Sequence, residues 1–281
     1  MTKVAEKRRA FRALHETGCF VLPNPWDVGS ARYLQSLGFK ALATTSSGAA
    51  WSLGHADGDV PLQPMLDHIR TIVEASDIPV NADFLSGFAT APHEVAANVR
   101  RCIHTGVAGL SIEDATGDAA SPLFDFSLAV ERVAAARAAI EAAGGQVMLV
   151  ARSECYLTGH GEPLKEAIRR LTAFAEAGAD CLYAPGVRTP ADIAAIVKAM
   201  SPKPVNVLAG GWPGSLNVAQ LADLGVRRIS VGGALARMAW AGVMRAAREI
   251  AEAGSFTALE GGALGADLNR MFAADSARRA P

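Results

Sequence analysis

One pattern recurs along this chain and constrains its fold more than any other feature. A stretch with helical periodicity ends in glycine, a short apolar segment follows, and polar or glycine-rich residues come next. The clearest copies are SLGFKALATTSSG, HTGVAGLSIEDATG, EAGADCLYAPG and DLGVRRISVGG. Glycine ends a helix because it adopts the left-handed conformation that side chains resist. The apolar segments lack strict alternation, which indicates parallel strands buried on both faces.

The pattern predicts eight strands with amphipathic helices between them. The predicted strands are Cys19–Leu22, Ala41–Thr45, Val80–Asp83, Gly109–Glu113, Val147–Arg152, Cys181–Ala184, Val205–Leu208 and Arg228–Val231. Eight β/α units predict an α/β fold of the (β/α)8 TIM-barrel type, which needs roughly 250 residues. A doubly wound open sheet also alternates strands and helices, but no G-x-G-x-x-G sequence follows the first strand here, which favours the barrel.

The two ends of the chain extend beyond this repeat. We expect one barrel domain over residues 1–281, with the barrel itself at about 17–253 and an extra helix before it. A helix over Ala234–Ala253 precedes a C-terminal extension, 254–281, for which we expect another helix at Phe256–Glu260 or Leu268–Ala274. The apolar residues of this extension indicate that it packs on something, and another subunit is one candidate.

Charge and cysteine content exclude several classes of function. The formal net charge is −1 and no basic stripe lies outside the first helix, so nucleic acid is not an expected partner, because phosphate binding needs clustered Lys and Arg. No apolar run approaches the roughly 20 residues that span a membrane, and the N-terminus lacks the apolar segment of a secretory signal. The four cysteines have no metal-ligand spacing, and we interpret them as free thiols of a cytoplasmic protein.

Active sites of such barrels lie at the C-terminal ends of the strands. The polar residues there are Asn24 after the first strand, Thr44, Thr45, Ser46 and Ser47 after the second, Asn81 and Asp83 on the third, Glu113 and Asp114 on the fourth, and Arg152 and Glu154 on the fifth. The last three strands end in APG, LAGG and VGG, which carry almost no polar side chains. Carboxylates therefore converge from strands three and four beside one arginine, and Asp57 and Asp59 of the loop after strand two can join them.

These residue types predict a metal-assisted site for an oxygen-rich anion. Carboxylates without histidine or thiolate suit a hard cation that retains water, which means Mg²⁺, with Mn²⁺ as the alternative. Arg152 suits bidentate binding of a substrate carboxylate, and the hydroxyl and N–H groups of TTSSG suit an oxyanion. Asp83 and Glu113 are the strongest candidates, because a buried carboxylate without a partner is costly.

Several of these residues also have simpler structural interpretations. Asp114 is equally well explained as a helix N-cap, Ser46 and Ser47 can cap the next element, and Asn24 between two prolines fits a turn. The segment Gly232–Ala234 resembles a backbone cradle for phosphate, although close packing of a helix on a strand also uses such glycines.

Residues that are missing from the strand ends exclude other chemistries. No lysine stands there, which argues against a Schiff-base aldolase, and no histidine stands there, which argues against a zinc hydrolase. His55 and His160 are the only two histidines that we expect in loops on the active face.

Four segments resemble the isocitrate lyase and phosphoenolpyruvate mutase superfamily. They are the stretch from LPNPWDVGS to SLGHADGD, then VNADFLSGFA, GVAGLSIEDATG and VMLVARSECYLTGHG. The combination of S-L-G-x-x-D, an acidic motif before G-[FY]-[GA], I-E-D and A-R-[ST]-[DE] carries the resemblance, which runs from about Phe20 to about Arg237. Within the superfamily, the chain resembles members of the oxaloacetate decarboxylase or 2,3-dimethylmalate lyase type.

The resemblance implies a (β/α)8 barrel that binds Mg²⁺ and a 2-oxo acid or its enolate. Matched position by position, it implies metal binding by Asp83, Glu113, Asp57 and Asn81, substrate binding by Thr45, Ser46, Ser47, Asp83 and Arg152, and catalytic roles for Arg152, Asp57 and Glu113. It further implies that helix eight is exchanged between subunits and that the protein is a homo-oligomer, a dimer or a tetramer.

The sequence departs from the superfamily pattern at three places. Asn81 stands where the first Asp of a D-x-D metal motif is usual, and Leu85 stands where Glu is common. Both changes remove negative charge from the expected metal site. The loop DATGDAASPLFDF after strand four lacks the K-[KR]-C-G-H motif of isocitrate and methylisocitrate lyases and the Lys of phosphonopyruvate enzymes.

The resulting hypothesis is a Mg²⁺-dependent lyase that cleaves a C–C bond of a small 2-oxo acid or substituted malate through an enolate. Asp57 or Glu154 could move the proton. One alternative is a phosphonomutase or phosphonopyruvate-type enzyme that acts on a P–C bond. The other is a relative without catalytic activity that binds 2-oxo acids.

Overall fold

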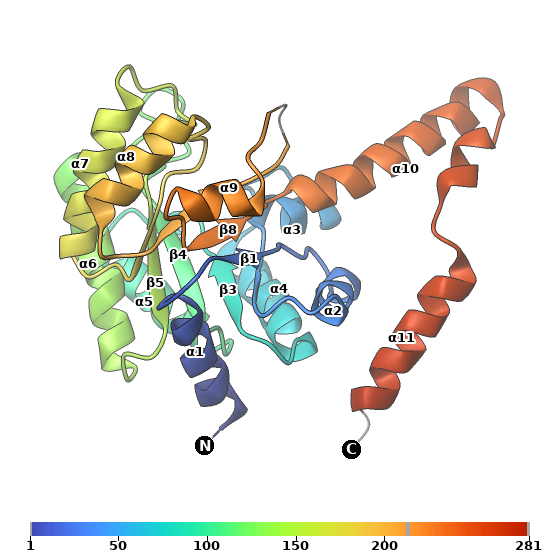
Figure 1. The fold of residues 1–281 in the computed structure, drawn as a ribbon, viewed down its shortest axis with the longest axis horizontal. Helices are drawn as coiled ribbons and strands as arrows, with labels where there is room; N and C mark the ends of the chain where they lie inside the picture. The colour runs from blue at the N-terminus through green and yellow to red at the C-terminus, as the bar shows by residue number, and fades with distance from the viewer. Residues whose placement is uncertain (1, 212–213, 280–281) are drawn as a thin grey trace.

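The structure is a computed structural model that describes residues 2–211 and 214–279. Its centre is a sheet of eight parallel strands in the order β1-β8-β7-β6-β5-β4-β3-β2, surrounded by helices (Figure 1). The strands are β1 Phe20–Leu22, β2 Leu42–Ala43, β3 Val80–Asp83, β4 Gly109–Glu113, β5 Met148–Arg152, β6 Cys181–Tyr183, β7 Val205–Leu208 and β8 Arg228–Ser230. The predicted (β/α)8 barrel is therefore confirmed, with every predicted strand present at nearly the predicted bounds.

The helices follow the predicted alternation with the strands. They are α1 Lys3–Leu14, α2 Val28–Ser36, α3 Ser46–Ser52, α4 Leu62–Ala75, α5 Pro92–Ile103, α6 Phe126–Ala142, α7 Pro163–Glu176, α8 Pro190–Met200, α9 Val218–Asp223, α10 Ala234–Ala253, the short 3-10 helix η1 Thr257–Gly261, and α11 Gly265–Arg279. The extra N-terminal helix is confirmed, and α10 has the predicted bounds. Both expected positions in the C-terminal extension are helical, and α11 is longer than expected.

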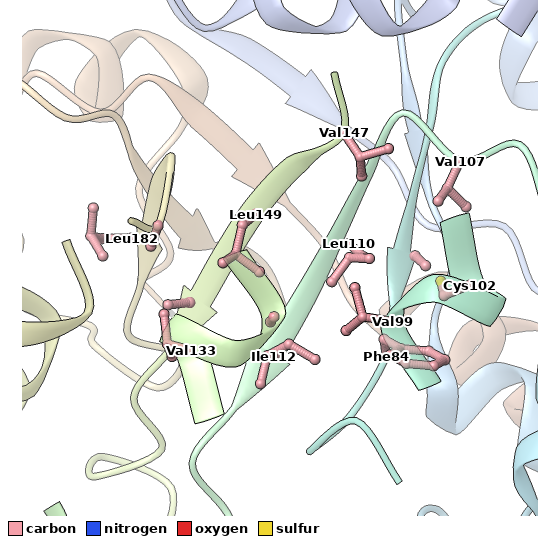
Figure 2. Packing of buried hydrophobic residues seen from close by; sticks show 14 of the residues in the cluster. Phe84, Val99, Cys102, Val107, Leu110, Ile112, Val133, Val147, Leu149 and Leu182 are labelled. Carbon is pink, nitrogen blue, oxygen red and sulfur yellow. The ribbon is translucent and has the colours of Figure 1, made fainter. Parts of the chain in front are cut away.

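Two apolar layers hold the barrel together. Residues such as Leu110, Ile112 and Leu149 point outward from the strands and pack with helix residues that include Val99 and Val133 (Figure 2). A smaller cluster fills the lower interior of the barrel and consists of Phe11, Leu22, Ala41, Ala43, Ala108 and Met148. Because Phe11 belongs to α1, this helix closes the end of the barrel opposite the predicted site. The polar side chains of the predicted site lie at the opposite end of the barrel, where the strands have their C-terminal ends.

Gly109 shows how tightly the lower interior is packed. A Cβ atom at this position would lie 2.7 Å from Phe11 Cε1 and 2.7 Å from Asn81 Oδ1. Such contacts are too short for any side chain, so glycine is required for the close approach of α1 to β4.

The seam between β1 and β2 is closed by few bonds. The backbone N–H of Ala43 donates to the Pro23 carbonyl at 3.1 Å. Next to it, the Asn24 side chain donates to the Thr44 carbonyl at 2.9 Å and accepts from the N–H groups of Val231 and Gly232, both at 2.9 Å. Asn24 was expected to be a turn residue, and the structure shows that its amide instead ties the ends of β1, β2 and β8 together.

The C-terminal helices form an arm outside the barrel. Figure 1 shows α10 projecting away from the barrel and α11 returning toward α2. At the returning end, Arg32 Nε lies 3.6 Å from Asp275 Oδ2, and Arg279 Nη2 lies 3.1 Å from Asp77 Oδ2. Along α10 the apolar side chains of Met238, Val243 and Met244 are exposed. Within 2–211 and 214–279, no helix is both long enough and apolar enough to cross a bilayer.

His15 lies directly below the barrel interior, at the C-terminal end of α1. Its ring is buried and packs edge-on against Phe11 and Phe20. Its Nδ1 lies 2.8 Å from the Phe11 carbonyl oxygen, which fits an N–H donor. Burial, with Arg228 nearby, lowers the pKa of His15 to about 3. The native protein therefore holds this imidazole in the neutral form.

This burial predicts a loss of stability in mild acid. The unfolded chain binds a proton at His15 near pH 6.5 and the native protein does so only near pH 3, so the free energy of unfolding should fall as the pH drops between these values. The slope from this residue is at most about 1.4 kcal/mol per pH unit. Urea unfolding from pH 7 to 4 should show a shallower slope for His15→Gln than for the native protein. The exposed His93→Gln is the control, and equal slopes for all three proteins would contradict the assignment.

Candidate active site

A cavity of about 250 Å³ opens at the C-terminal ends of the strands. Its lining includes Thr45, Ser46, Ser47, Asp57, Asn81, Asp83, Glu113 and Arg152, the residues for which the family resemblance implies a role. Asp59, the second acid expected from the loop after β2, is not among the described lining residues. Residues from five separate segments of the chain therefore meet in one place, as the barrel fold requires.

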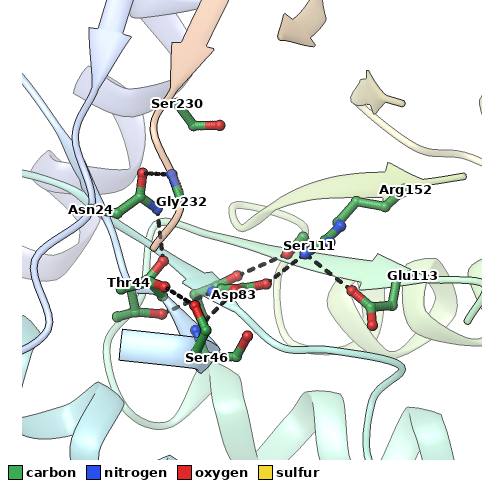
Figure 3. Close-up of polar contacts among 12 residues, drawn as sticks. Asn24, Thr44, Ser46, Asp83, Ser111, Glu113, Arg152, Ser230 and Gly232 are labelled. Atoms are coloured by element: carbon green, nitrogen blue, oxygen red, sulfur yellow. Dashed lines mark hydrogen bonds and ion pairs between the residues drawn. The ribbon is translucent and has the colours of Figure 1, made fainter. Parts of the chain in front are cut away.

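Arg152 is the junction of this cavity. Its Nη1 lies 2.8 Å from Asp83 Oδ1 and 3.0 Å from Glu113 Oε2, and its Nε lies 2.9 Å from Glu154 Oε1 (Figure 3). The backbone explains the meeting, because Glu113 and Arg152 are register partners on β4 and β5. All four side chains are mostly buried, with exposed fractions between 7% and 18%. The predicted convergence of acids from neighbouring strands is therefore present, and a guanidinium lies among them.

Asp83 also fixes the loop after β2. Its Oδ2 accepts from the backbone N–H of Ser46 at 2.9 Å, and its own N–H donates to Thr44 Oγ1 at 2.9 Å. Thr45 is the N-cap of α3, since its Oγ1 accepts from the N–H of Gly48 at 3.3 Å. The capping role considered for Ser46 and Ser47 therefore belongs to Thr45. The hydroxyl of Ser47 lies 3.0 Å from that of Thr45 at the start of the same helix.

The carboxyl groups around Arg152 outnumber the one guanidinium that they share. Burial, followed by repulsion from Glu154, Asp83 and Asp57, outweighs attraction by Arg152 and raises the pKa of Glu113 to about 8. Burial also raises the pKa of Glu154. Asp57 lies on an exposed loop, yet partial burial of its carboxyl group and the charge of Asp83 raise its pKa as well. One guanidinium cannot balance four carboxyl groups, so the site favours an additional positive charge, either a proton or a cation.

The oxygen ligands are the right type for a hard cation, although they do not form a closed metal cage. Among residues 2–211 and 214–279, no three His, Cys, Asp or Glu side chains are arranged so that they could hold a metal ion by themselves. Glu113 Oε2 is buried and accepts no hydrogen bond within this part of the chain, although Arg152 lies close to it. Mg²⁺ commonly binds through one or two carboxylates, several waters and the substrate. The donor set fits that mode of binding, with Asp83, Glu113 and Asp57 as the acids.

The floor of the cavity is polar, which the sequence analysis missed. Strands six to eight were expected to contribute almost no polar side chains, but Tyr183, Arg228 and Ser230 line the cavity, and Asn206 is buried beside Arg228. The expectation was wrong because it considered the residues after each strand. Inside a barrel, every second strand residue points inward. The alternation of polar and apolar residues in VNV and RIS is the signal that could have identified them.

Backbone N–H groups of the glycine-rich loop after β8 already bind a side chain of this chain. The N–H groups of Val231 and Gly232, which were considered as a phosphate cradle, donate to Asn24 Oδ1. A Cβ atom on Gly233 would lie 2.6 Å from Ser47 Oγ. These glycines therefore serve the close packing of β8 on α3, the alternative interpretation considered for them.

Asp114 is a buried anchor, and the helix N-cap interpretation is wrong. Its Oδ1 accepts from the backbone N–H of Glu154 at 2.8 Å, and its Oδ2 lies 3.1 Å from Arg170 Nη1. Arg170 also donates to the Phe124 carbonyl at 2.9 Å. The helix that follows this loop is α6, whose N-cap is Asp125. Asp114 and Arg170 therefore fix the loop after β4 and the backbone of Glu154 in the same network.

The turn after Asp83 has an unusual backbone. Leu85 and Phe88 have φ angles of 48° and 57°, which side chains normally avoid. The Leu85 carbonyl accepts from the N–H of Glu113 at 3.0 Å, and buried Arg132 donates to the carbonyl groups of Ser86, Ala89 and Thr90. These bonds hold the strained turn in place beside two of the acids. Leu85, which stands where related sequences carry Glu, lines the cavity with an apolar side chain.

The two loop histidines lie outside this cavity, and the cysteines are free. His55 and His160 lie on exposed loops, and neither is among the lining residues of this cavity. All four cysteines are unpaired, as predicted.

Comparison with known proteins agrees with this architecture. The family model for phosphoenolpyruvate phosphomutase matches residues 11–251. The chain belongs to the phosphoenolpyruvate mutase and isocitrate lyase superfamily. The resemblance seen in the four sequence segments is thereby confirmed, and so is the enzyme class, because members of this superfamily among its relatives are lyases and mutases.

Three relatives illustrate the range of the superfamily. A crystal structure from Burkholderia cenocepacia J2315, described as a lyase/mutase, is 47% identical, with a TM-score of 0.93 over 97% of this chain and 98% of that one. The oxaloacetate decarboxylase of Paraburkholderia xenovorans is 30% identical over 81% of this chain and 76% of its own length. A phosphonopyruvate hydrolase in complex with oxalate and Mg²⁺ is 25% identical, with a TM-score of 0.83 over 99% of this chain and 97% of that one.

The Asp114 anchor gives a prediction for stability. Asp114→Ala should lower the free energy of unfolding by about 1–3 kcal/mol, because it leaves the buried N–H of Glu154 without an acceptor and Arg170 with Glu166 as its one carboxylate partner among the described residues. Urea denaturation at neutral pH measures this change. The control is Asp118→Ala in the same loop, where the side chain is exposed and the expected change is within about 0.5 kcal/mol. Equal losses for the two variants would show that Asp114 does not anchor the loop.

Proposed function

We propose that this protein is a Mg²⁺-dependent carbon–carbon lyase that acts on a small 2-oxo acid or a substituted malate through an enolate. The observation that carries the proposal is the meeting of Asp83, Glu113 and Glu154 on Arg152 at the mouth of the barrel. The oxaloacetate decarboxylase among the relatives supports the substrate class, and the hydrolase complex with oxalate and Mg²⁺ supports the metal.

The acids of the mouth are assigned to the metal. Asp83 and Glu113, together with Asp57, would hold Mg²⁺, partly through water. Bound there, Mg²⁺ would act as a Lewis acid toward the oxygens of the substrate. Asn81 remains a predicted ligand, although its Oδ1 now faces Arg228 Nη1 at 3.4 Å. Mn²⁺ has the same ligand preferences and is the expected substitute.

Arg152 and the loop after β2 are assigned to the substrate. The contacts among the described residues engage Nε and Nη1 of Arg152, so Nη2 is the nitrogen that would face a substrate carboxylate. Ser46, Ser47 and Thr45 line the opposite side of the cavity and would contact the oxygens of the oxo acid. Together these groups would orient the bond that breaks.

The proton is assigned to an acid with a raised pKa. Burial raises the pKa of Glu113, Asp57 and Glu154 above the ordinary value for a carboxyl group, which suits a group that holds and moves a proton. Glu154 is held by the Asp114 network, whereas Asp57 lies on the loop at the mouth. We therefore propose Asp57 or Glu154 as the residue that moves the proton, and we expect Glu113 to lose its own proton when a cation binds.

Activity can be tested on a panel of oxaloacetate, 2,3-dimethylmalate, 2-methylisocitrate and phosphonopyruvate with Mg²⁺. We expect release of an oxo acid from at least one of the three carbon acids, and loss of that release in EDTA with recovery on addition of Mg²⁺. Asp83→Asn and Glu113→Gln should each lower kcat/KM by about 100-fold or more, because each removes a carboxylate proposed to hold the Mg²⁺ that would stabilise the developing anion. Asp67→Asn on the outer face of α4 is the control.

Two outcomes would overturn this assignment. Turnover of phosphonopyruvate alone would identify the alternative P–C enzyme. Binding of the acids without turnover of any of them would identify a relative without catalytic activity.

We also propose that the protein is a homo-oligomer, a dimer or a tetramer, in which the arm formed by α10 and α11 packs on a second copy. An apolar cavity of about 730 Å³ lies between α3 and the base of α10 and is lined by residues that include Trp51, Met238 and Met244. A long helix with an exposed apolar face is costly in water unless another surface covers it. This apolar face of α10 continues onto the barrel. We therefore expect the barrel of a second copy of the chain to cover it.

Light scattering after gel filtration tests the oligomer. The native protein should elute as a dimer or tetramer, and the double variant Met238→Glu, Met244→Glu should elute as a smaller species. Leu37→Glu is a matched control, since Leu37, the residue that follows α2, is 57% exposed and Met244 on α10 is 54% exposed. A native protein that is monomeric at micromolar concentration would refute the proposal.

A further inference from the structure

Five inward-facing residues form a continuous row across the barrel. Glu113 pairs in register with Arg152, Arg152 with Tyr183, Tyr183 with Asn206, and Asn206 with Arg228. The row begins at the acidic mouth on β4 and ends on β8, where Arg228 is the first residue of its strand. It therefore connects the proposed metal side of the cavity with a second basic residue that the mechanism above does not use.

Arg228 is almost completely buried, with 3% of its surface exposed, and it lines the same cavity as Asp83 and Arg152. Its Nε donates to Asn206 Oδ1 at 2.9 Å, and its Nη1 reaches across the interior to Asn81 Oδ1 at 3.4 Å. Both partners are neutral amides. In the part of the chain that the structure describes, none of the ion pairs includes Arg228.

Arg152 has carboxylate partners, whereas Arg228 has none among the described residues. The acids around Arg152 raise its pKa, whereas burial lowers the pKa of Arg228 because distant charges such as Asp83 do not offset the loss of water. A buried guanidinium keeps its charge, and leaving that charge without an anion is unfavourable. Asn206 Nδ2 donates to Ser230 Oγ at 3.0 Å, so the nearby side-chain groups on β7 and β8 are satisfied within the floor itself. The charge of Arg228 is thus the unbalanced feature of the floor.

We propose that Arg228 binds a second anionic group of the substrate, so that the site selects acids with two negative groups over acids with one. The inference rests on the proposed function, because it places the first carboxylate at Arg152 and the cation. It extends that function by naming the residue that determines the substrate class. The acids around Arg152 would then attract a cation, and Arg228 would attract an anion. A short dicarboxylate that binds the cation with one end would place its second carboxylate on Arg228.

Asn81 has a defined part in this arrangement. A neutral amide at 3.4 Å from Arg228 Nη1 shares a hydrogen bond and leaves the positive charge available. An aspartate of nearly the same size at this position would pair with Arg228 and cancel its charge. The sequence departure at Asn81 therefore preserves the affinity of the floor for an anion.

Two ligands that differ at one end provide the test. Malate and 2-hydroxybutanoate differ only in that a carboxylate of the first is a methyl group in the second, and neither is an oxo acid. Calorimetry at saturating Mg²⁺ should show tighter binding of malate by the native protein. Arg228→Gln should weaken malate by about 10- to 100-fold, which corresponds to the loss of one charged hydrogen-bonding partner. Binding of 2-hydroxybutanoate should change less than about threefold.

Matched variants separate a direct contact from a general effect of charge. Arg227→Gln changes the neighbouring arginine, which donates to the Gly18 carbonyl on the outside of the barrel, and should leave both affinities unchanged. Asn81→Asp retains the arginine but neutralises it, and should lower the preference for malate as Arg228→Gln does. If Arg228→Gln does not fold, as judged by its thermal unfolding, the preference measured for Asn81→Asp decides the question.

The outcomes are distinguishable from a failure of the proposed function. If the native protein binds neither ligand and no oxo acid, the proposed function itself fails. If the native protein binds malate and 2-hydroxybutanoate equally, or if neither Arg228→Gln nor Asn81→Asp changes their ratio, Arg228 serves only to balance the acids of the mouth. In that case, Arg228→Gln should instead bind Mg²⁺ more tightly than the native protein.

Discussion

The active end of this barrel depends on one arginine shared by three acids. Arg152 ends β5 and contacts Asp83 from β3, Glu113 from β4 and Glu154 from the loop that follows it. Without that guanidinium, several buried carboxyl groups would repel one another within a small volume, and the loops that carry them would separate. The same contact leaves an excess of acid over base, which is the property that makes the mouth suitable for a cation.

The rest of the structure holds this junction in place from three sides. Thr44 and the N-terminal turn of α3 fix both the backbone and the second oxygen of Asp83. Asp114 and Arg170 fix the backbone of Glu154 from behind. The Asn24 amide closes the seam between β1 and β2, where the ladder of backbone hydrogen bonds is incomplete. Each of these is a buried polar contact whose groups are satisfied, so together they favour one arrangement of the acids.

Charge is distributed unevenly through the cavity. The carboxyl groups and Arg152 lie at the mouth, whereas the floor contains Arg228 with neutral partners. A ligand that carries a metal-binding oxygen at one end and a negative group at the other would be complementary to both regions. This distribution connects two of the three departures from the superfamily pattern, since Asn81 and Leu85 each stand where related sequences carry an acid, close to Asp83 and Glu113.

The sequence by itself was sufficient for the fold, the family and the residues of the mouth. The repeated helix-to-strand segments, most of which contain a glycine before the strand, are local signals, and the rule that parallel strands end at one rim then placed Asp83, Glu113 and Arg152 together. What the sequence could not supply was the partner of each side chain. Asp114 and Asn24 became anchors rather than a cap and a turn, and Arg228 emerged on the floor of the site. Those outcomes depend on strand register and on contacts between residues far apart in the chain, which only the closed barrel brings within hydrogen-bonding distance.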